Sequence, residues 1–130
     1  MIELRPFTAD DIPLVEPWLA DPESRRRLGG MRLPVVIGHG YVAYDDGEAV
    51  ALVHVEHLEA STMALLVAPH ARRRGVGRAV FAQLLEGELA DRPLAITAEP
   101  DNVASIRLLE GAGLRVAGTD KDGFLEYVRL

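Results

Sequence analysis

A run of three arginines, Arg72, Arg73 and Arg74, stands directly before two glycines, Gly75 and Gly77, and an apolar helix pattern follows. Glycine lacks a β-carbon, so an anion can approach its backbone closely. The first N–H groups of a helix have no partner within the helix, and with the helix dipole they bind phosphate. Nearby guanidinium groups add charge that a polyphosphate offsets. The segment therefore predicts a polyphosphate site; the alternative is an ordinary helix start with solvated arginines.

Other motifs for anion binding or nucleophilic catalysis fit the chain poorly. A dinucleotide fingerprint needs a small residue where the chain has Val80, and a P-loop needs Lys-Ser or Lys-Thr where it has Arg78-Ala79. None of the serines lies in a Gly-x-Ser-x-Gly motif, and the chain has no cysteine. A hydrolase or an acyl-cysteine intermediate is therefore not favoured.

A strand and a helix must position the arginine and glycine residues. The segment "STMALLV" at residues 61–67 predicts the strand, and apolar residues recur on one helical face from Val76 to about Leu89.

Upstream, residues 2–5 read as a strand and residues 8–20 as a helix that opens with a capping box, Thr8 and Asp11. A second helical segment begins at residue 21 and stops at Gly29, and residues 31–40 read as a loop.

Two turn signals divide the remaining strands. Asp46-Gly47 predicts a hairpin within residues 41–58, and Asp122-Gly123 predicts another between residues 114–120 and 124–130. Residues 93–98 read as a buried strand and residues 102–110 as a helix. The order β-α-α-β-β-β-α-β-α-β-β predicts an α/β (α+β) fold, a mixed sheet with helices on its faces, in one domain over residues 1–130.

Composition narrows the class of function. The net charge is −6, and the acidic excess lies in residues 1–60, which hold 11 acids and 5 bases, whereas residues 61–130 hold 9 of each. An acidic chain argues against a general nucleic-acid binder, so the arginines suggest a small anionic ligand. No apolar run approaches the roughly 20 residues of a membrane span, and the first residues carry acids early and show no apolar segment of the signal-peptide type. We expect a soluble, cytoplasmic protein that binds neither nucleic acid nor membranes.

Two separated segments resemble the GNAT superfamily of N-acetyltransferases. "VAPHARRRGVG" is similar to the acyl-CoA loop of that family, with matches at Val67, Pro69, Arg72, Gly75 and Gly77. "NVASIRLLEGAGL" is similar to a second family motif, with matches at Asn102, Ser105, Leu108, Glu110 and Gly113. The order of elements agrees as well. The resemblance implies a mostly antiparallel mixed sheet of about six or seven strands with helices on both faces.

The resemblance also implies an acetyl-CoA site. Backbone N–H groups from about Arg73 to Arg78 would hold the pyrophosphate, and the strand would pair with the pantetheine arm. A backbone N–H near Val67 would polarise the thioester carbonyl. Asn102 would lie beside the pantetheine or order that wall; the alternative reading is a helix N-cap, which is compatible with either role. The implied cofactor-binding residues are Leu65, Leu66, Val67, Arg72, Arg73, Arg74, Gly75, Val76, Gly77, Arg78, Asn102 and Ser105.

Two positions depart from the family pattern. Leu109 stands where the family often has the tyrosine that serves as general acid, and Ser105 or a water are weak substitutes for it. A thiol with a pKa of about 8.5 leaves tolerably well unaided, so activity is still expected. Arg73 stands where glycine is common, which is tolerated as long as its backbone stays helical.

A base for the acceptor amine must come from elsewhere than the strand at residues 61–67, which carries no carboxylate. The segment "LVHVEH" offers His54 and Glu56 on one strand face and His57 on the other. Glu56 is the first candidate for the base, followed by His57 and His54, and the alternative is that all three are simply solvated. Because alternation separates the histidines, no metal site is expected.

The function expected from the resemblance is direct transfer of an acetyl group from acetyl-CoA to a primary amine, with Glu56, His57 and Val67 as the catalytic residues. The acidic excess of residues 1–60 suggests a cationic acceptor. The alternative is a non-catalytic acyl-CoA-binding or regulatory module on the same fold. A homodimer is compatible with the sequence, which fixes neither the oligomeric state nor the acceptor.

Overall fold

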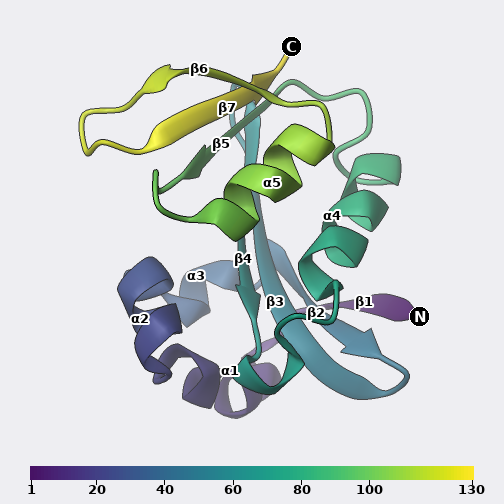
Figure 1. Cartoon of the computed structure of the whole chain (residues 1–130). Coiled ribbons are helices and arrows are strands. Elements are labelled where there is room, and N and C mark those ends of the chain that lie inside the picture. Colours follow the sequence, from purple (N-terminus) through teal and green to yellow (C-terminus); the bar gives the residue numbers. More distant parts are fainter. The chain divides into compact units, whose positions relative to one another are not determined.

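Seven strands and five helices make up the chain, and the computed structural model describes all of residues 1–130 (Figure 1). The expected mixed sheet is confirmed, with hydrogen-bonded neighbours in the order β1-β2-β3-β4-β5-β7-β6. The residues divide into two compact units, 1–55 with 63–80 and 56–62 with 81–130.

The strands of the first unit are β1 (Ile2–Pro6), β2 (Gly40–Asp45), most of β3 (Glu48–His57) and most of β4 (Ser61–Val67). β1 pairs with β2 and β2 with β3, both antiparallel. The predicted hairpin is confirmed at Asp46 and Gly47, whose φ angles of 49° and 87° are both positive, as a two-residue turn of this kind requires. Within this unit β4 is an edge strand.

The helices of this unit are α1 (Ile12–Leu19), α2 (Pro22–Leu28), α3 (Leu33–Val36) and the start of α4 (Val76–Glu86). A 3₁₀ turn, Ala9–Asp11, precedes α1, and there the Thr8 N–H donates to Asp11 Oδ2 at 2.9 Å, as the expected capping box requires. The reading of residues 31–40 as a loop was incomplete, because the short α3 forms there.

The core of the first unit is apolar on both strands and helices. Full burial of one such side chain stabilises a fold by about 1.5–3 kcal/mol relative to exposure. α3 forms because it buries two of its four side chains in this core. The fully or nearly fully buried side chains include Phe7, Val15, Leu33, Val36, Val42, Val50, Leu52, Val53, Leu66 and Val80.

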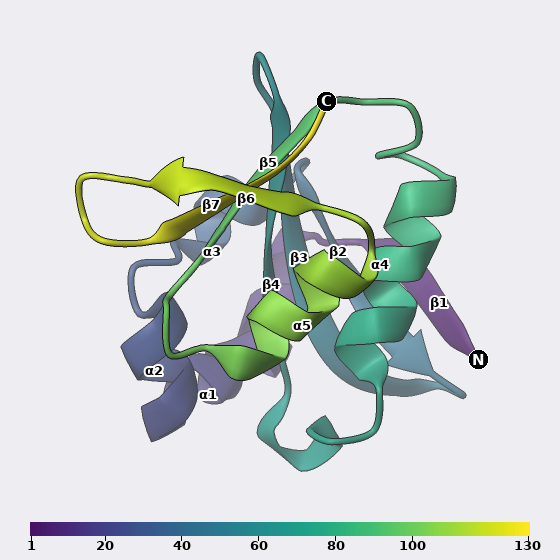
Figure 2. The ribbon, with the colours of Figure 1, turned by 45° about the horizontal axis from the view of Figure 1, so that its top comes forward.

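The second unit holds β5 (Leu94–Ala98), α5 (Val103–Gly111), β6 (Arg115–Thr119), β7 (Leu125–Arg129) and the rest of α4. Ser61 pairs in parallel with Leu94, and β5-β7-β6 are antiparallel. In Figures 1 and 2, α5 lies beside these three strands. Its core includes Phe81, Leu84, Leu89, Leu94, Ile96, Leu109, Leu114 and Tyr127.

Local chemistry ends α5 and turns the final hairpin. Gly113 has a φ of 91°, and beyond it the Leu114 N–H returns to the Leu109 carbonyl at 3.1 Å. Asp120 Oδ1 accepts from the N–H groups of Asp122 and Phe124, each at 2.9 Å, so the side chain organises the turn. β6 is an edge strand whose register with β7 shifts between Val116 and Gly118.

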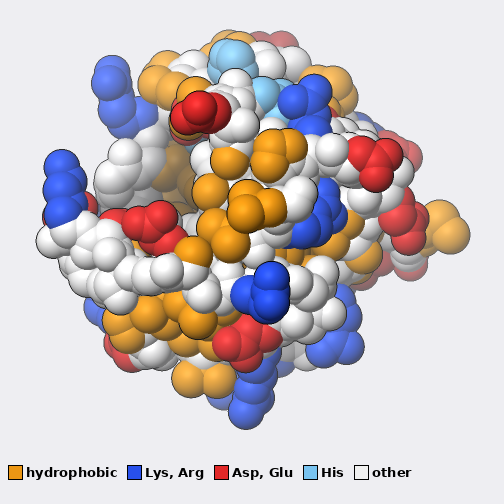
Figure 3. Space-filling model, turned by 90° about the horizontal axis from the view of Figure 1, so that it is seen from above, with side chains coloured by type: hydrophobic (Ala, Val, Ile, Leu, Met, Phe, Trp, Pro, Cys, Tyr) orange, Lys and Arg blue, Asp and Glu red, His pale blue; other side chains and the backbone are white.

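None of the helices combines the length and apolar character that a bilayer crossing requires. On the face shown in Figure 3, arginine or lysine and acidic side chains are interspersed with apolar ones, so this face carries no continuous basic area.

Candidate functional site

The arginine–glycine turn, residues 68–78, connects β4 to α4 within the first unit. At its start the Ala68 N–H donates to the Val50 carbonyl at 2.8 Å, and Pro69–Ala71 form a 3₁₀ turn closed by the Ala71 N–H on the Ala68 carbonyl at 2.9 Å. Arg72 is extended, with φ −64° and ψ 152°, and α4 begins at Val76. Hydrogen bonding thus fixes where the chain leaves the sheet.

Two residues of the turn have left-handed backbone. Gly75 has a φ of 74° and Arg73 a φ of 64°. The condition under which Arg73 was expected to replace glycine without cost, a helical backbone, is therefore not met. The left-handed conformation costs a non-glycine residue roughly 1–2 kcal/mol, which explains why glycine suits this position better. Contacts elsewhere in the turn must offset that cost.

The start of α4 presents backbone donors, as predicted. The first α-helical bond runs from the Ala79 N–H to the Gly75 carbonyl at 3.1 Å, so the N–H groups of Val76, Gly77 and Arg78 precede it and have no partner within the helix. A β-carbon built on Gly77 would lie 3.2 Å from Leu65 Cδ2. Strand β4 and the helix start are therefore in close contact at Gly77.

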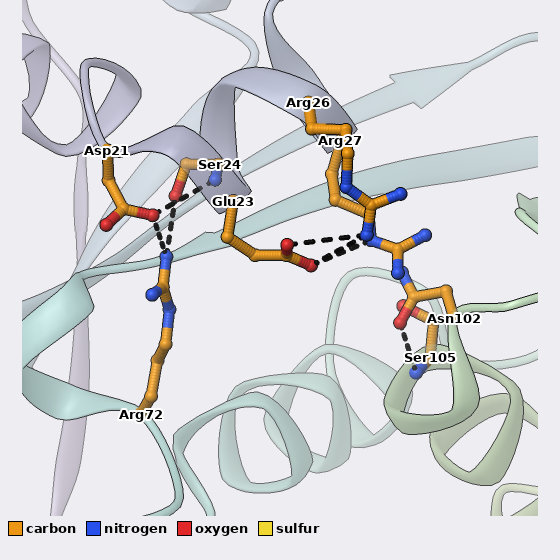
Figure 4. A network of polar contacts seen from close by, with 8 residues as sticks. All are labelled: Asp21, Glu23, Ser24, Arg26, Arg27, Arg72, Asn102 and Ser105. Atoms are coloured by element: carbon orange, nitrogen blue, oxygen red, sulfur yellow. Dashed lines mark hydrogen bonds and ion pairs between the residues drawn. The ribbon is translucent and has the colours of Figure 1, made fainter.

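Arg72 does not point into solvent but toward α2 (Figure 4). Its Nη2 donates to Asp21 Oδ2 and, at 3.0 Å, to Ser24 Oγ. Asp21 is the N-cap residue of α2, and the same Oδ2 accepts from the Ser24 N–H at 3.1 Å. Two hydrogen bonds hold the pKa of the Asp21 carboxyl below its usual value: the one from Arg72 has the larger effect, and the one from the Ser24 N–H the smaller.

Arg74 and His70 are held from the other side by the turn between β2 and β3. Arg74 Nη2 lies 3.0 Å from Glu48 Oε1 and 3.3 Å from Asp45 Oδ2, and His70 Nε2 lies 3.6 Å from Glu48 Oε2. The His70 ring also meets the edge of Trp18, with centroids 6.4 Å apart. Carboxylates of the chain therefore offset the charge of two of the four arginines.

Arg73 and Arg78 behave differently from Arg72 and Arg74. Both are exposed and take part in no ion pair. The predicted set of arginines thus divides into Arg72 and Arg74, which fix the turn, and Arg73 and Arg78, whose charges stay available to an anion. Sequence reasoning treated the four alike, because the carboxylates that distinguish them lie 26 to 51 residues away.

In the second unit, His57 is the centre of a hairpin cluster that also contains Ser61 and Glu88. His57 Nδ1 lies 2.9 Å from Ser61 Oγ, and Nε2 lies 2.8 Å from Glu88 Oε2. These contacts link a serine, a histidine and a carboxylate, as in a nucleophilic triad. However, Ser61 is only 2% exposed, so a substrate cannot reach its hydroxyl. With both ring nitrogens engaged, the cluster holds the hairpin together, and His57 is a weaker candidate for a base than expected.

The remaining candidates for the base differ in exposure. Glu56 is exposed near the end of β3, and His54 is half-buried. β4 carries no carboxylate. No group of three or more His, Cys, Asp or Glu side chains is arranged to hold a metal ion. Glu56 is thus exposed, whereas His54 is partly covered and both ring nitrogens of the exposed His57 are engaged.

The α5 segment places Asn102 and Leu109 in structural roles. Asn102 Oδ1 accepts from the Ser105 N–H at 3.3 Å, so the alternative of a helix N-cap is confirmed. Leu109 is 1% exposed and belongs to the core. The Tyr127 hydroxyl donates to Glu110 Oε2 at 2.9 Å. Burial is the larger cause that raises the pKa of Tyr127, and the hydrogen bond to Glu110 is the smaller one.

Six of the 11 acids of residues 1–60 take part in ion pairs within the chain. Asp46 and Asp45 pair with the N-terminal amine at 3.3 and 3.1 Å, and Glu23 pairs with Arg26 and Arg27 of its own helix. The acids in ion pairs are Glu3, Asp21, Glu23, Asp45, Asp46 and Glu48. The N-terminal amine, Arg72 and Arg74 are not among the five bases of this segment, so their pairs offset a part of the acidic excess locally.

Comparison with known proteins places this geometry in a family. The acetyltransferase (GNAT) domain matches residues 37–113, which include the arginine–glycine turn and most of the second motif. No curated protein sequence matches the chain significantly.

Solved structures share the fold over nearly the whole chain. A GNAT-family acetyltransferase from Streptococcus agalactiae aligns with a TM-score of 0.81 at 15% identity, covering 99% of this chain and 95% of that one. The GNAT domain of S. lividans PAT aligns with a TM-score of 0.81 at 21% identity, over 98% and 89%. AAC(6′)-Ib, solved with paromomycin and acetyl-CoA, aligns with a TM-score of 0.75 at 22% identity, over 98% and 91%.

Proposed function

The chain belongs to the acetyltransferase (GNAT) domain family, and from this premise we propose that it transfers an acetyl group from acetyl-CoA to a primary amine within a ternary complex. The observation that carries the proposal is the arginine–glycine turn. It combines unpartnered N–H groups at the start of α4, a glycine in close contact with β4, and two exposed arginines without carboxylate partners.

These residues fit the chemistry of a pyrophosphate. The N–H groups of Val76, Gly77 and Arg78 point out of the helix start, where the dipole favours an anion. Arg73 and Arg78 supply charge, while Arg72 and Arg74 hold the backbone. AAC(6′)-Ib, which shares the fold, has been solved with acetyl-CoA and with coenzyme A.

The edge of β4 suits the pantetheine arm. Its register with β5 consists of one pair, Ser61 with Leu94, and within the first unit β4 is an edge strand. Leu65 and Val67 are half-buried there, whereas Leu66 is 1% exposed and packs in the core. An extended amide chain can add to such an edge as a further strand does. In this role the Val67 backbone N–H polarises the carbonyl that the amine attacks.

The acceptor amine must lose a proton before or during attack. Glu56 takes that proton in our proposal, directly or through water, because it is exposed and β4 offers no carboxylate. The acceptor is proposed to be a primary amine. A cationic acceptor is supported by the acidic excess of residues 1–60, which Arg72 and Arg74 offset in part through their ion pairs with Asp21 and Glu48.

A second candidate function is acyl-CoA binding without catalysis. It is favoured by Leu109, which replaces the family's tyrosine with a buried side chain that cannot donate a proton. Both candidates require the same donor site and differ only in turnover.

The test combines binding with turnover. Calorimetry with acetyl-CoA and CoA measures donor binding, and release of free CoA across a panel of primary amines and neutral alcohols measures transfer. Donor binding with amine-dependent release supports the enzyme. Donor binding without release on any amine supports the binding module. Absence of donor binding contradicts both.

A further inference from the structure

A buried polar contact helps to attach α2 to the first unit. α2 has seven residues, and its one buried residue is Ser24, 4% exposed. A helix this short is not stable by itself, and α2 buries no apolar side chain fully. α1 packs against it, and Glu23 pairs only with arginines of the same helix among its hydrogen-bond partners. The buried serine is the group that Arg72 contacts.

One carboxylate oxygen serves both elements. Asp21 Oδ2 caps α2 through the Ser24 N–H at 3.1 Å and also accepts from Arg72 Nη2, which reaches Ser24 Oγ at 3.0 Å. The Asp21 and Arg72 side chains are 22% and 38% exposed, so water screens this pair only in part. Displacement of Arg72 would therefore disturb the cap of α2 and its buried hydroxyl together.

Arg72 also sits at a sensitive place in the arginine–glycine turn. It directly precedes Arg73, whose left-handed backbone costs free energy, and it lies three residues before Gly75. A contact that fixes Arg72 favours the strained backbone on which the N–H groups of the helix start depend. The same contact thus stabilises α2 on one side and the anion-binding backbone on the other.

We propose that Arg72 is a positioning residue that couples occupancy of the arginine–glycine turn to the order of α2. This inference rests on the proposed function, because the ligand that occupies the turn is the acetyl-CoA proposed above. Arg72 acts through Asp21 and Ser24 and does not contact the donor. By linkage, a donor that favours the ordered turn also orders α2, and loss of order in α2 weakens donor binding by the same factor.

The experiment is hydrogen exchange of the α2 amides, with and without saturating CoA, together with calorimetric affinity for CoA. The variants are Arg72→Gln and Asp21→Asn. Asparagine is as good an N-cap as aspartate, so Asp21→Asn removes the charge pair and keeps the cap. Arg25→Gln is the matched control, because Arg25 is an exposed arginine on α2 that is neither buried nor in an ion pair.

In the parent and in Arg25→Gln, we expect CoA to slow exchange in α2. In Arg72→Gln and Asp21→Asn, α2 should exchange faster, CoA should no longer slow it, and CoA should bind about two- to fivefold more weakly, as a partly exposed ion pair allows. The double variant should bind CoA no more weakly than Arg72→Gln alone.

Two results overturn the coupling while the proposed function stands. One is CoA binding to the parent with unchanged exchange in α2. The other is weaker binding in Arg72→Gln with full affinity in Asp21→Asn, which would mean that Arg72 contacts the donor itself. No CoA binding by the parent would overturn the coupling and the proposed function together.

Discussion

The arginine–glycine turn and the hairpin cluster are both rich in polar side chains, yet they leave different groups available. In the turn, carboxylates engage Arg72 and Arg74, and this fixes a backbone whose N–H groups and remaining arginines stay accessible. In the hairpin cluster, His57 uses both ring nitrogens on Ser61 and Glu88. Polar contacts thus leave backbone donors and two arginines accessible in the first region, whereas in the second they engage the histidine itself.

The comparison shows that residue type does not decide which groups can do chemistry. A histidine near a strand end and an arginine before a glycine are both ordinary candidates for a site. Their neighbours in space determine whether they serve the ligand or the fold.

The largest effect is expected at Glu56, the exposed carboxylate next to the engaged histidine. Glu56→Gln should lower turnover on a primary amine by about 10²–10⁴-fold, the range of a general base. The rising limb of the pH profile should move toward the pKa of the free amine, measured by steady-state kinetics across pH. Glu59→Gln, which changes a nearby exposed carboxylate, is the control. Full turnover with an unchanged profile would remove Glu56 from the mechanism.

A charge at the helix start should block the donor. Gly77→Glu places a carboxylate where the pyrophosphate is proposed to bind, and like charges in such contact cost several kcal/mol, so CoA affinity should fall by about 100-fold or more. Gly77→Ala is the control, because its β-carbon meets only the end of the Leu65 side chain at 3.2 Å. Calorimetry measures both. Equal affinity in Gly77→Glu and the parent would mean that the donor binds elsewhere.

If the hairpin cluster serves the fold, its loss should appear in stability. His57→Ala leaves the Ser61 hydroxyl buried without its partner, which should cost about 1–3 kcal/mol in the free energy of unfolding, measured with urea. Adding Ser61→Ala removes the buried hydroxyl that has no partner. The double variant should therefore lose less free energy of unfolding than the sum of the losses in the two single variants. Additive losses would show that the contact between the two side chains is not the source of the effect.

The smallest effect concerns acid stability at Asp21. Arg72 holds the pKa of this carboxyl below its ordinary value, so the stability it contributes is present above that ordinary value and is lost as pH falls through the lowered one. The difference in unfolding free energy between the parent and Arg72→Gln should therefore shrink in acid. Urea unfolding near neutral pH and in acid measures it. A difference that is independent of pH would contradict the ion pair.

Much of the fold followed from local signals. The two hairpins at Asp46-Gly47 and Asp122-Gly123 and the cap at Asn102 were predicted because turn and cap chemistry lies within a few residues. The helix α3 was missed, since four residues are too few to show a period and Pro34 suggests a break. Burial of Leu33 and Val36, which is a tertiary effect, stabilises it.

For the candidate site as well, features set by neighbouring residues in the sequence were predicted, and features set by distant residues were not. The strand, glycines and helix start of the arginine–glycine turn were predicted, because their order along the chain carries the information. The left-handed Arg73 was not, since non-glycine residues seldom adopt that backbone. The partners of Arg72 and His57 were not predicted either, because Asp21 and Glu88 lie 51 and 31 residues away.

The register shift in β6 has a consequence for behaviour at high protein concentration. Ala117 is the extra residue between Val116 and Gly118, and all five residues of the strand are exposed. A straight, exposed edge strand offers a ready template for another chain, which leads to aggregation. The bulge twists this edge away from such pairing, and Arg115 adds a charge to it. Removal of Ala117 would straighten the edge and make the protein prone to self-association through β6.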